Sequence, residues 1–331
     1  GAILVNSTIT AGGDNVSLFG ASGANSDLIV NAALTAGGDM TIVAQHDLII
    51  NSSVSTLAAN ADITMYADVD TNGTGGVLVT TTGAVSAIAT VTLRGSAGTS
   101  ATFSNAGVGT GTGFSLAAPL ATVAVQVDSD GSNSQISSTG SSVVLDTHAA
   151  TSGSDIIING RITTTTNGGI LLVTADAQLS IGVNGDLLTD GAITLTAAGG
   201  IDTAGDITTT NDAIDFQNNV VMTGNCVITT AAGAGNITFA GTLNGTTDFA
   251  EDLSITAGTG SVTFTGAVGA TIDLGDITIV SALDVTFSSS LAADSFTQSA
   301  GTGDTQFDAA VTVNSTATAD IAITTSTVTV N

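Results

Sequence analysis

The chain has 331 residues and a formal net charge of −26, because 28 acidic residues face only two basic ones, Arg94 and Arg161. Nucleic acid is therefore excluded as a partner, since phosphate binding needs basic side chains. An anionic membrane surface is disfavoured for the same reason. No apolar stretch reaches the length of a transmembrane helix, so we expect no membrane insertion.

Residue types favour strands throughout the chain. Thr, Val, Ile and Ser dominate the apolar runs, and β-branched side chains suit a pleated surface better than a helix. Gly is abundant at 41 residues, while Pro119 is the single proline. Many corners and few breaks in strand pairing are thus expected, with no significant helix.

Short strings recur in the amino-terminal half. TAGGD occupies 10–14 and 35–39, and DLIVN at 27–31 returns as DLIIN at 47–51 and DIIIN at 155–159. A β-branched run that alternates with an Asn or Gly-Gly-Asp corner indicates strand, turn, strand, turn. Between about 95 and 142 the period is lost. We interpret this zone as widened coils or a loop excursion within one continuous solenoid over 1–331.

The carboxyl-terminal half repeats a strand with a central aromatic residue. The aromatics are Phe216, Phe239, Phe264, Phe287 and Phe307, separated by 23, 25, 23 and 20 residues. A period in this range is typical of one rung of a solenoid. The sequence therefore predicts an all-β solenoid of roughly fourteen coils of about 20 to 25 residues, with these rings in an internal ladder.

These strings resemble repeats of known surface proteins. TAGGDMTIVAQHDLIINSSVST at 35–56 resembles the repeats of filamentous-haemagglutinin-type adhesins. AGTGSVTFTGAV at 257–268 and SFTQSAGTGDTQFDAAV at 295–311 resemble the β-strand repeats of giant bacterial surface proteins. The resemblance implies a right-handed parallel β-helix, an extracellular or cell-surface location on a bacterium, and an adhesive or biofilm-matrix role.

Two loops carry short oxygen ligands at alternating spacing, which can wrap a hard cation such as Ca²⁺. The first loop lacks the bidentate Glu expected at the twelfth position of an EF-hand, which here is Val79, and the nonapeptide of calcium-binding β-rolls does not recur. No cofactor is required by the sequence, and calcium is the one ligand it suggests. The candidate calcium ligands are Asp68, Asp70 and Asn72 in the first loop and Asp128, Asp130 and Asn133 in the second.

Catalysis is not expected. Polysaccharide lyases need a basic residue to abstract a proton, and the two arginines lie far apart in the sequence. Glycoside hydrolysis needs paired carboxylates. Such pairs exist, but a chain this rich in Asp produces them by chance; they are Asp202 with Asp206, and Asp212 with Asp215.

The remaining reactive side chains have structural interpretations. His46 and His148 are expected at exposed corners, because a metal site or proton relay would need several such groups to converge. Cys226 is the single cysteine, so an intramolecular disulfide is impossible. We expect it to be a small, partly buried strand residue.

Both ends of the chain continue the strand pattern, with Ile3 and Val5 at one end and Val328 and Val330 at the other. Uncapped solenoid ends expose unpaired strand edges. We therefore expect a nonenzymatic rod that stacks head to tail with itself, or that forms part of the shaft of a large adhesin. A carbohydrate-binding or carbohydrate-cleaving β-helix that recognises surface or matrix glycans is the alternative. It would need exposed aromatics, and Tyr66 and the phenylalanines are the only ones present.

Overall fold

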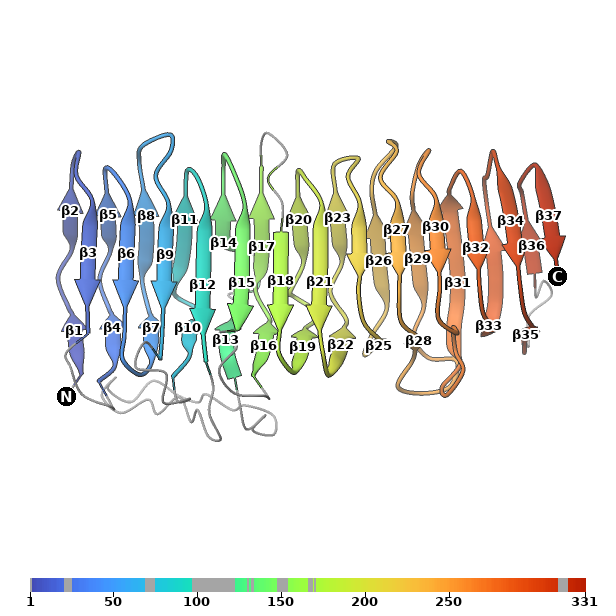
Figure 1. Cartoon of the computed structure of the whole chain (residues 1–331), viewed down its shortest axis with the longest axis horizontal. Coiled ribbons are helices and arrows are strands. Elements are labelled where there is room, and N and C mark those ends of the chain that lie inside the picture. Colours follow the sequence, from blue (N-terminus) through green and yellow to red (C-terminus); the bar gives the residue numbers. More distant parts are fainter. Residues whose placement is uncertain are drawn as a thin grey trace.

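The computed structural model describes residues 2–20, 26–68, 75–96, 123–129, 131, 134–147, 154–165, 169, 171–314 and 321–331. This part of the chain is all-β, and its strands form three parallel sheets that stack as a β-solenoid. Successive turns lie side by side from the amino-terminal to the carboxyl-terminal end of a rod (Figure 1). The predicted fold class is thus confirmed. None of the described residues forms a helix that could cross a membrane.

From β1 to β30 the strands join the first, second and third sheets in a fixed order, and from β31 onward they join only the second and third. The first sheet contains β1 (Ile3–Val5), β4 (Leu28–Val30), β7 (Leu48–Ile50), β10 (Val77–Val79), β13 (Val123–Val127), β16 (Asp155–Ile158), β19 (Gln178–Ile181), β22 (Gly200–Thr203), β25 (Val220–Met222) and β28 (Leu243–Asn244). The second sheet contains β2 (Ile9–Ala11), β5 (Leu34–Ala36), β8 (Ser53–Thr56), β11 (Ala84–Ala87), β14 (Ser134–Ser138), β17 (Arg161–Thr164), β20 (Leu187–Thr189), β23 (Ile207–Thr209), β26 (Cys226–Thr229), β29 (Leu253–Thr256), β31 (Leu274–Ser281), β33 (Leu291–Gln298), β35 (Val311–Val313) and β36 (Ile321–Ile323). The third sheet contains β3 (Val16–Phe19), β6 (Met40–Val43), β9 (Ile63–Tyr66), β12 (Val91–Gly95), β15 (Val143–Thr147), β18 (Leu171–Ala175), β21 (Ile193–Ala197), β24 (Ile214–Phe216), β27 (Ile237–Phe239), β30 (Val262–Phe264), β32 (Val285–Phe287), β34 (Asp304–Phe307) and β37 (Thr327–Val330).

The solenoid has about 11 turns, so the expected number of roughly fourteen coils is too high. One reason is that turns differ in length. Most hydrogen bonds between adjacent turns join residues 20 to 31 positions apart, but Thr90 Oγ1 donates to Ser141 Oγ across 51 positions. This long turn includes much of the zone where the sequence period is lost. Within that zone, β13 and β14 still join their sheets, with register shifts where they pair with β16 and β17.

The interior is one hydrophobic cluster that runs from Val5 to Phe307. It forms because alternate residues of each strand point inward. In β21, Ile193 and Leu195 are fully buried while the threonines between and beyond them are half-buried. Parallel pairing in register then places like residues above one another, as with Ile193 and Ile214.

The five phenylalanines of the third sheet stack as a column inside the rod. Adjacent ring centroids lie 4.6, 5.1, 4.6 and 5.2 Å apart, and the ring planes are within 10° of parallel. The separation follows from the strand spacing of about 4.8 Å. Phe296 of β33 packs edge-on against Phe287 and Phe307. All these rings are at most 3% exposed, so they belong to the core.

The first sheet is buried on both faces over several turns. All three residues of β4, β7 and β10 are buried. The central residues Ile29, Ile49 and Leu78 form a second, smaller cluster, separate from the interior. The continuous apolar runs of this sheet reflect that burial, because a strand covered on both faces does not alternate.

Candidate functional site

Corner side chains bind the backbone of the following turn. Asp39 N–H donates to Asn15 Oδ1 at 2.8 Å, Asp62 N–H donates to Asp39 Oδ1 at 3.1 Å, and Thr90 N–H donates to Asp62 Oδ1 at 2.8 Å. Asp and Asn have the short reach that such corner bonds need. This accounts for the use of Asp rather than Glu. Further carboxylates that accept an N–H from the next turn are Asp155, Asp186, Asp206, Asp248, Asp252 and Asp284.

Both arginines also join adjacent turns. Arg94 Nη2 lies 2.6 Å from Asp146 Oδ2, and Arg161 Nη2 lies 3.0 Å from Asp186 Oδ2. The Arg94 guanidinium also lies 5.6 Å from the centroid of the Tyr66 ring. Both guanidinium groups are therefore already engaged by aspartates of the next turn, and the Tyr66 ring by Arg94, rather than left available to bind a ligand.

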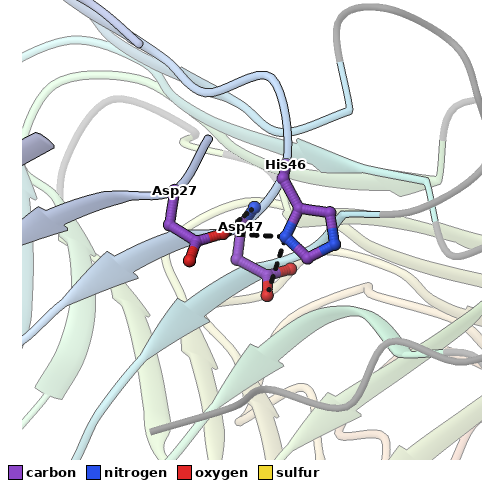
Figure 2. Close-up of side chains that lie close together, drawn as sticks. All are labelled: Asp27, His46 and Asp47. Atoms are coloured by element: carbon purple, nitrogen blue, oxygen red, sulfur yellow. Dashed lines mark hydrogen bonds and ion pairs between the residues drawn. The ribbon is translucent and has the colours of Figure 1, made fainter. Parts of the chain in front are cut away.

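The one group of three or more metal-binding side chains that converge within the described residues is Asp27, His46 and Asp47. Asp27 directly precedes β4, while His46 and Asp47 directly precede β7. Because Leu28 pairs with Leu48, the two aspartates occupy equivalent corners of adjacent turns. Figure 2 shows the imidazole of His46 turned toward both carboxylates.

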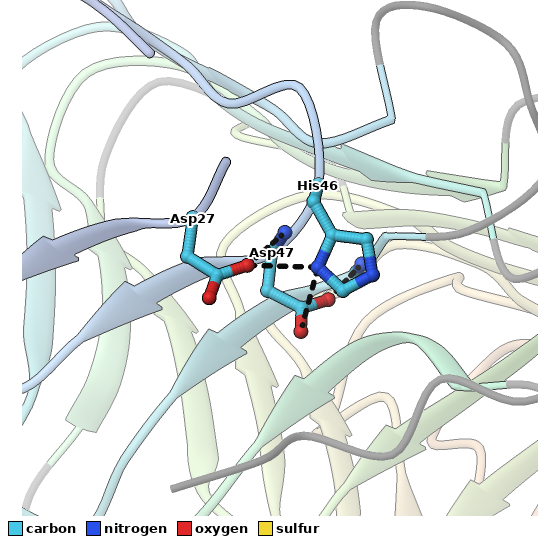
Figure 3. Close-up of polar contacts among 4 residues, drawn as sticks. Asp27, His46 and Asp47 are labelled. Carbon is cyan, nitrogen blue, oxygen red and sulfur yellow. Dashed lines mark hydrogen bonds and ion pairs between the residues drawn. The ribbon is translucent and has the colours of Figure 1, made fainter. Parts of the chain in front are cut away.

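His46 Nδ1 is the centre of this group. It lies 2.7 Å from Asp27 Oδ1 and 3.3 Å from Asp47 Oδ2. The backbone extends the polar contacts: Asp47 N–H donates to Asp27 Oδ1 at 3.3 Å (Figure 3). Gly76 N–H donates to Asp47 Oδ1 at 3.0 Å. Three successive turns are thus joined at one corner.

Burial differs sharply between the two carboxylates. Asp47 is 1% exposed, whereas the side chain of Asp27 is 24% exposed and that of His46 is 20% exposed. Burial raises the pKa of Asp47 to about 6. The hydrogen bond from Gly76 and the charge interaction with His46 oppose this rise, while the charge interaction with Asp27 adds to it. Gly75 allows this close packing: its φ is +147°, and a Cβ there would lie 2.6 Å from the carbonyl oxygen of His46.

This arrangement corrects the expected position of His46. The side chain is not at an exposed corner but is largely covered and paired with two carboxylates. The repeat DLIVN and DLIIN contained the signal, because aligning the strings places Asp27 over Asp47 beside His46. His148 lies outside the described residues.

The predicted calcium loops are described only in part. Asp70, Asn72, Asp130 and Asn133 lie outside the described residues. Asp68 is 2% exposed and has a φ of +53°, and its N–H donates to the carbonyl oxygen of His46. In the second loop, Gln126 Nε2 donates to Asp128 Oδ1 at 2.9 Å. A calcium site in either loop stays a prediction.

Of the carboxylate pairs noted in the sequence, Asp202 and Asp206 have separate structural partners. Asp202 accepts a hydrogen bond from Gln178 Nε2, while Asp206 accepts the N–H of Val227. Asp202 also borders a surface depression of about 360 Å³ beside β22, β25 and β28. No aromatic side chain lines this depression, which therefore lacks the ring surface that sugars commonly contact.

The predicted assembly ends differ from one another. Val5 is buried at 8% exposure, because it pairs with Val30 of the next turn, and Ile3 is half-buried. Val328 and Val330 of β37 are 48% and 70% exposed. These two valines line an apolar hollow of about 450 Å³ with Phe307.

Cys226 is more buried than expected. It is 2% exposed, and its thiol lies 3.6 Å from the carbonyl oxygen of Thr203, to which it donates. Burial raises the pKa of the thiol to about 12. The thiol is accordingly an inert core group at neutral pH.

Comparison with protein families, curated proteins and solved structures gives no match to this chain. The resemblance of its repeats to surface adhesins therefore stays an expectation based on the repeat strings alone.

Proposed function

We propose that the chain is a nonenzymatic structural rod of the bacterial exterior, in which each turn serves as the template for the next. It either stacks head to tail with further copies into a surface filament or forms part of the shaft of a large adhesin. Its partner is another solenoid turn, and adhesion to glycans would be a property of the assembled fibre.

The apolar carboxyl-terminal face of the rod is the observation that carries this proposal. Phe307, the last ring of the column, borders the hollow that Val328 and Val330 line. A further turn placed there would continue the second and third sheets, whose last strands are β35, β36 and β37, and would cover apolar surface, which favours association. Unpaired strand edges also pair readily with added strands.

Engagement of the polar side chains supports a structural role rather than a catalytic one. The corner carboxylates bind backbone N–H groups, and both arginines pair with aspartates of adjacent turns. The carbohydrate alternative is weaker because the stacked phenylalanines are internal. Tyr66 lies under the Arg94 guanidinium and is half-buried, while Phe19 and Phe249 are 64% and 41% exposed, so these three rings of the described residues are the ones that alternative still has to test.

Electron microscopy of the purified chain tests the proposal. One chain should measure about 50 to 60 Å along its axis, given a rise of about 4.8 Å per turn. Filaments with an axial repeat of that length would support stacking of copies. Uniform short rods at high concentration would contradict self-stacking and favour a role as part of the shaft of a large adhesin. Compact particles would contradict the rod-shaped structure itself.

Charged substitutions at the hollow provide the matched comparison. Val330→Lys should abolish filaments by placing a charge on the exposed strand. Val183→Lys is the control, because Val183 is similarly exposed at 72% but lies on the side of the rod, between β19 and β20. Equal loss of filaments in both variants would show that charge alone, rather than the end face, controls assembly.

A further inference from the structure

The corner formed by Asp27, His46 and Asp47 has the chemistry of a cation site, and it is independent of the role as a rod. We propose that these three residues bind a divalent transition-metal ion, of which Zn²⁺ is the representative, through His46 Nδ1 and one oxygen of each carboxylate. The site would join two adjacent turns of the solenoid near its amino-terminal end (Figure 2).

The positions of the ligand atoms suit a shared ion. Zinc binds imidazole nitrogen and carboxylate oxygen with bonds of about 2.0 to 2.2 Å, which places ligand atoms roughly 3 to 4 Å apart. His46 Nδ1 lies 2.7 and 3.3 Å from its two carboxylate oxygens, and one ligand atom from each of the three residues lies within 4.8 Å of the others. Small side-chain rotations of the partly exposed Asp27 would complete the geometry.

The charges of the site also favour an ion. Two carboxylates face one imidazole nitrogen, at 2.7 Å for Asp27 and 3.3 Å for Asp47, and a single proton on Nδ1 can point at only one of them at a time. Asp47 is buried, and an uncompensated buried carboxylate is costly. A divalent ion in place of the Nδ1 proton would neutralise both carboxylates at once.

Backbone contacts hold the ligands in position without the ion. His46 N–H donates to the Ser26 carbonyl, and Gly76 N–H fixes Asp47 Oδ1. Such outer contacts orient metal ligands. The partial exposure of Asp27 and His46 leaves a route for the ion and room for water as a further ligand.

The donor set selects among metals. Imidazole nitrogen suits zinc and other transition metals, whereas calcium prefers six to eight oxygen ligands. The site therefore differs in kind from the two calcium loops that the sequence suggests. It is expected to bind Zn²⁺ in the presence of excess Ca²⁺ or Mg²⁺.

Calorimetric titration of the full chain with Zn²⁺ tests the site. The chain should carry no histidine tag, and excess Mg²⁺ should be present to occupy the diffuse acidic surface. We expect one Zn²⁺ per chain, with affinity lowered more than about tenfold in His46→Gln and in Asp27→Asn. Zn²⁺ should also shift the Nδ1 resonance of His46 in ¹⁵N spectra of the two histidines.

His148→Gln is the control, because it removes the other histidine of the chain. Asp27→Asn keeps the imidazole and an oxygen that can accept its hydrogen bond. If His46→Gln does not fold, the Zn²⁺ affinity of Asp27→Asn therefore tests the site. Absence of saturable Zn²⁺ binding would overturn the proposal. So would wild-type affinity in Asp27→Asn, or equal competition by Ca²⁺.

Discussion

At the scale of single residues, the protein uses carboxylates in two opposite environments. Most corner aspartates remain near water and accept backbone N–H groups from the next turn. A few are buried, among them Asp128 at 8% exposure. Burial raises the pKa of Asp128, although hydrogen bonds from Gln126 and Asn159 oppose this effect. The charge of such a residue weakens the folded state.

Asp128→Asn should therefore raise the melting temperature at pH 7 by a few degrees. Asparagine retains an oxygen that can accept from Gln126 Nε2 but carries no charge. A group whose folded pKa is raised stabilises the fold below its unfolded pKa, and this stability is lost as pH rises through the folded pKa. The gain should accordingly shrink toward zero near pH 3, as melting curves from about pH 3 to pH 8 would reveal.

Glu251→Gln provides the comparison with the opposite sign. Burial alone would raise the pKa of Glu251, but hydrogen bonds from Thr246 and Thr247 outweigh it and lower the pKa. The charged form is stabilising above the ordinary pKa, and its contribution is lost in acid. This variant should lose roughly 1 to 3 kcal/mol at pH 7 and little at low pH. Parallel pH profiles for the two variants would contradict both assignments.

At the scale of strands, the period of the sequence specifies the stacking. Each phenylalanine of the column fills the same position of its turn, so the rings meet at the strand spacing. Edge-on packing by Phe296 closes the column on the side of the second sheet. Large rings at one level thus fix the register of β24, β27, β30, β32 and β34.

Phe264→Ala should destabilise the protein by about 3 to 5 kcal/mol, because it opens a cavity between two stacked rings. Phe264→Leu should cost less, since it keeps most of the volume. Phe19→Ala is the control: Phe19 is 64% exposed, and its loss should change stability by less than about 0.5 kcal/mol. Denaturant unfolding would measure all three, and equal losses at both phenylalanines would contradict an internal column.

The period also shows what the sequence could predict and what it could not. The spacing of Phe216, Phe239 and Phe264 predicts stacked parallel strands because identical positions must align. The sequence indicates widened coils or a loop excursion in the zone between β12 and β15, but its length per turn could not be predicted because its residues follow no period. The site at His46 was missed for a different reason: its ligands come from adjacent turns, and only their alignment brings Asp27 beside Asp47.

At the scale of the whole molecule, the charge of −26 is the dominant unfavourable feature. Carboxylates repeat along the corners of successive turns, so like charges recur along the rod. Hydrogen bonds from backbone N–H groups offset part of this repulsion. The rest depends on counterions, because only two arginines are available.

The melting temperature should therefore rise by several degrees as NaCl increases from about 0.02 M to about 0.5 M, where the Debye length falls to roughly 4 Å. Scanning calorimetry with a chelator present would measure screening separately from bound metal ions. A flat or falling melting temperature would indicate that the corner hydrogen bonds already compensate the charge.

Pairing between nearest turns has a mechanical consequence. Each described strand pairs only with strands of neighbouring turns, so within the described part of the rod no strand pairing bridges distant turns. When the two ends are pulled apart, the load falls on the outermost turn, which peels away while the others stay intact. Each peeled turn releases about 80 Å of slack, given roughly 23 residues at up to 3.4 Å each. Under tension we therefore expect such a rod to lengthen stepwise, one turn at a time, which pulling experiments on single molecules would measure.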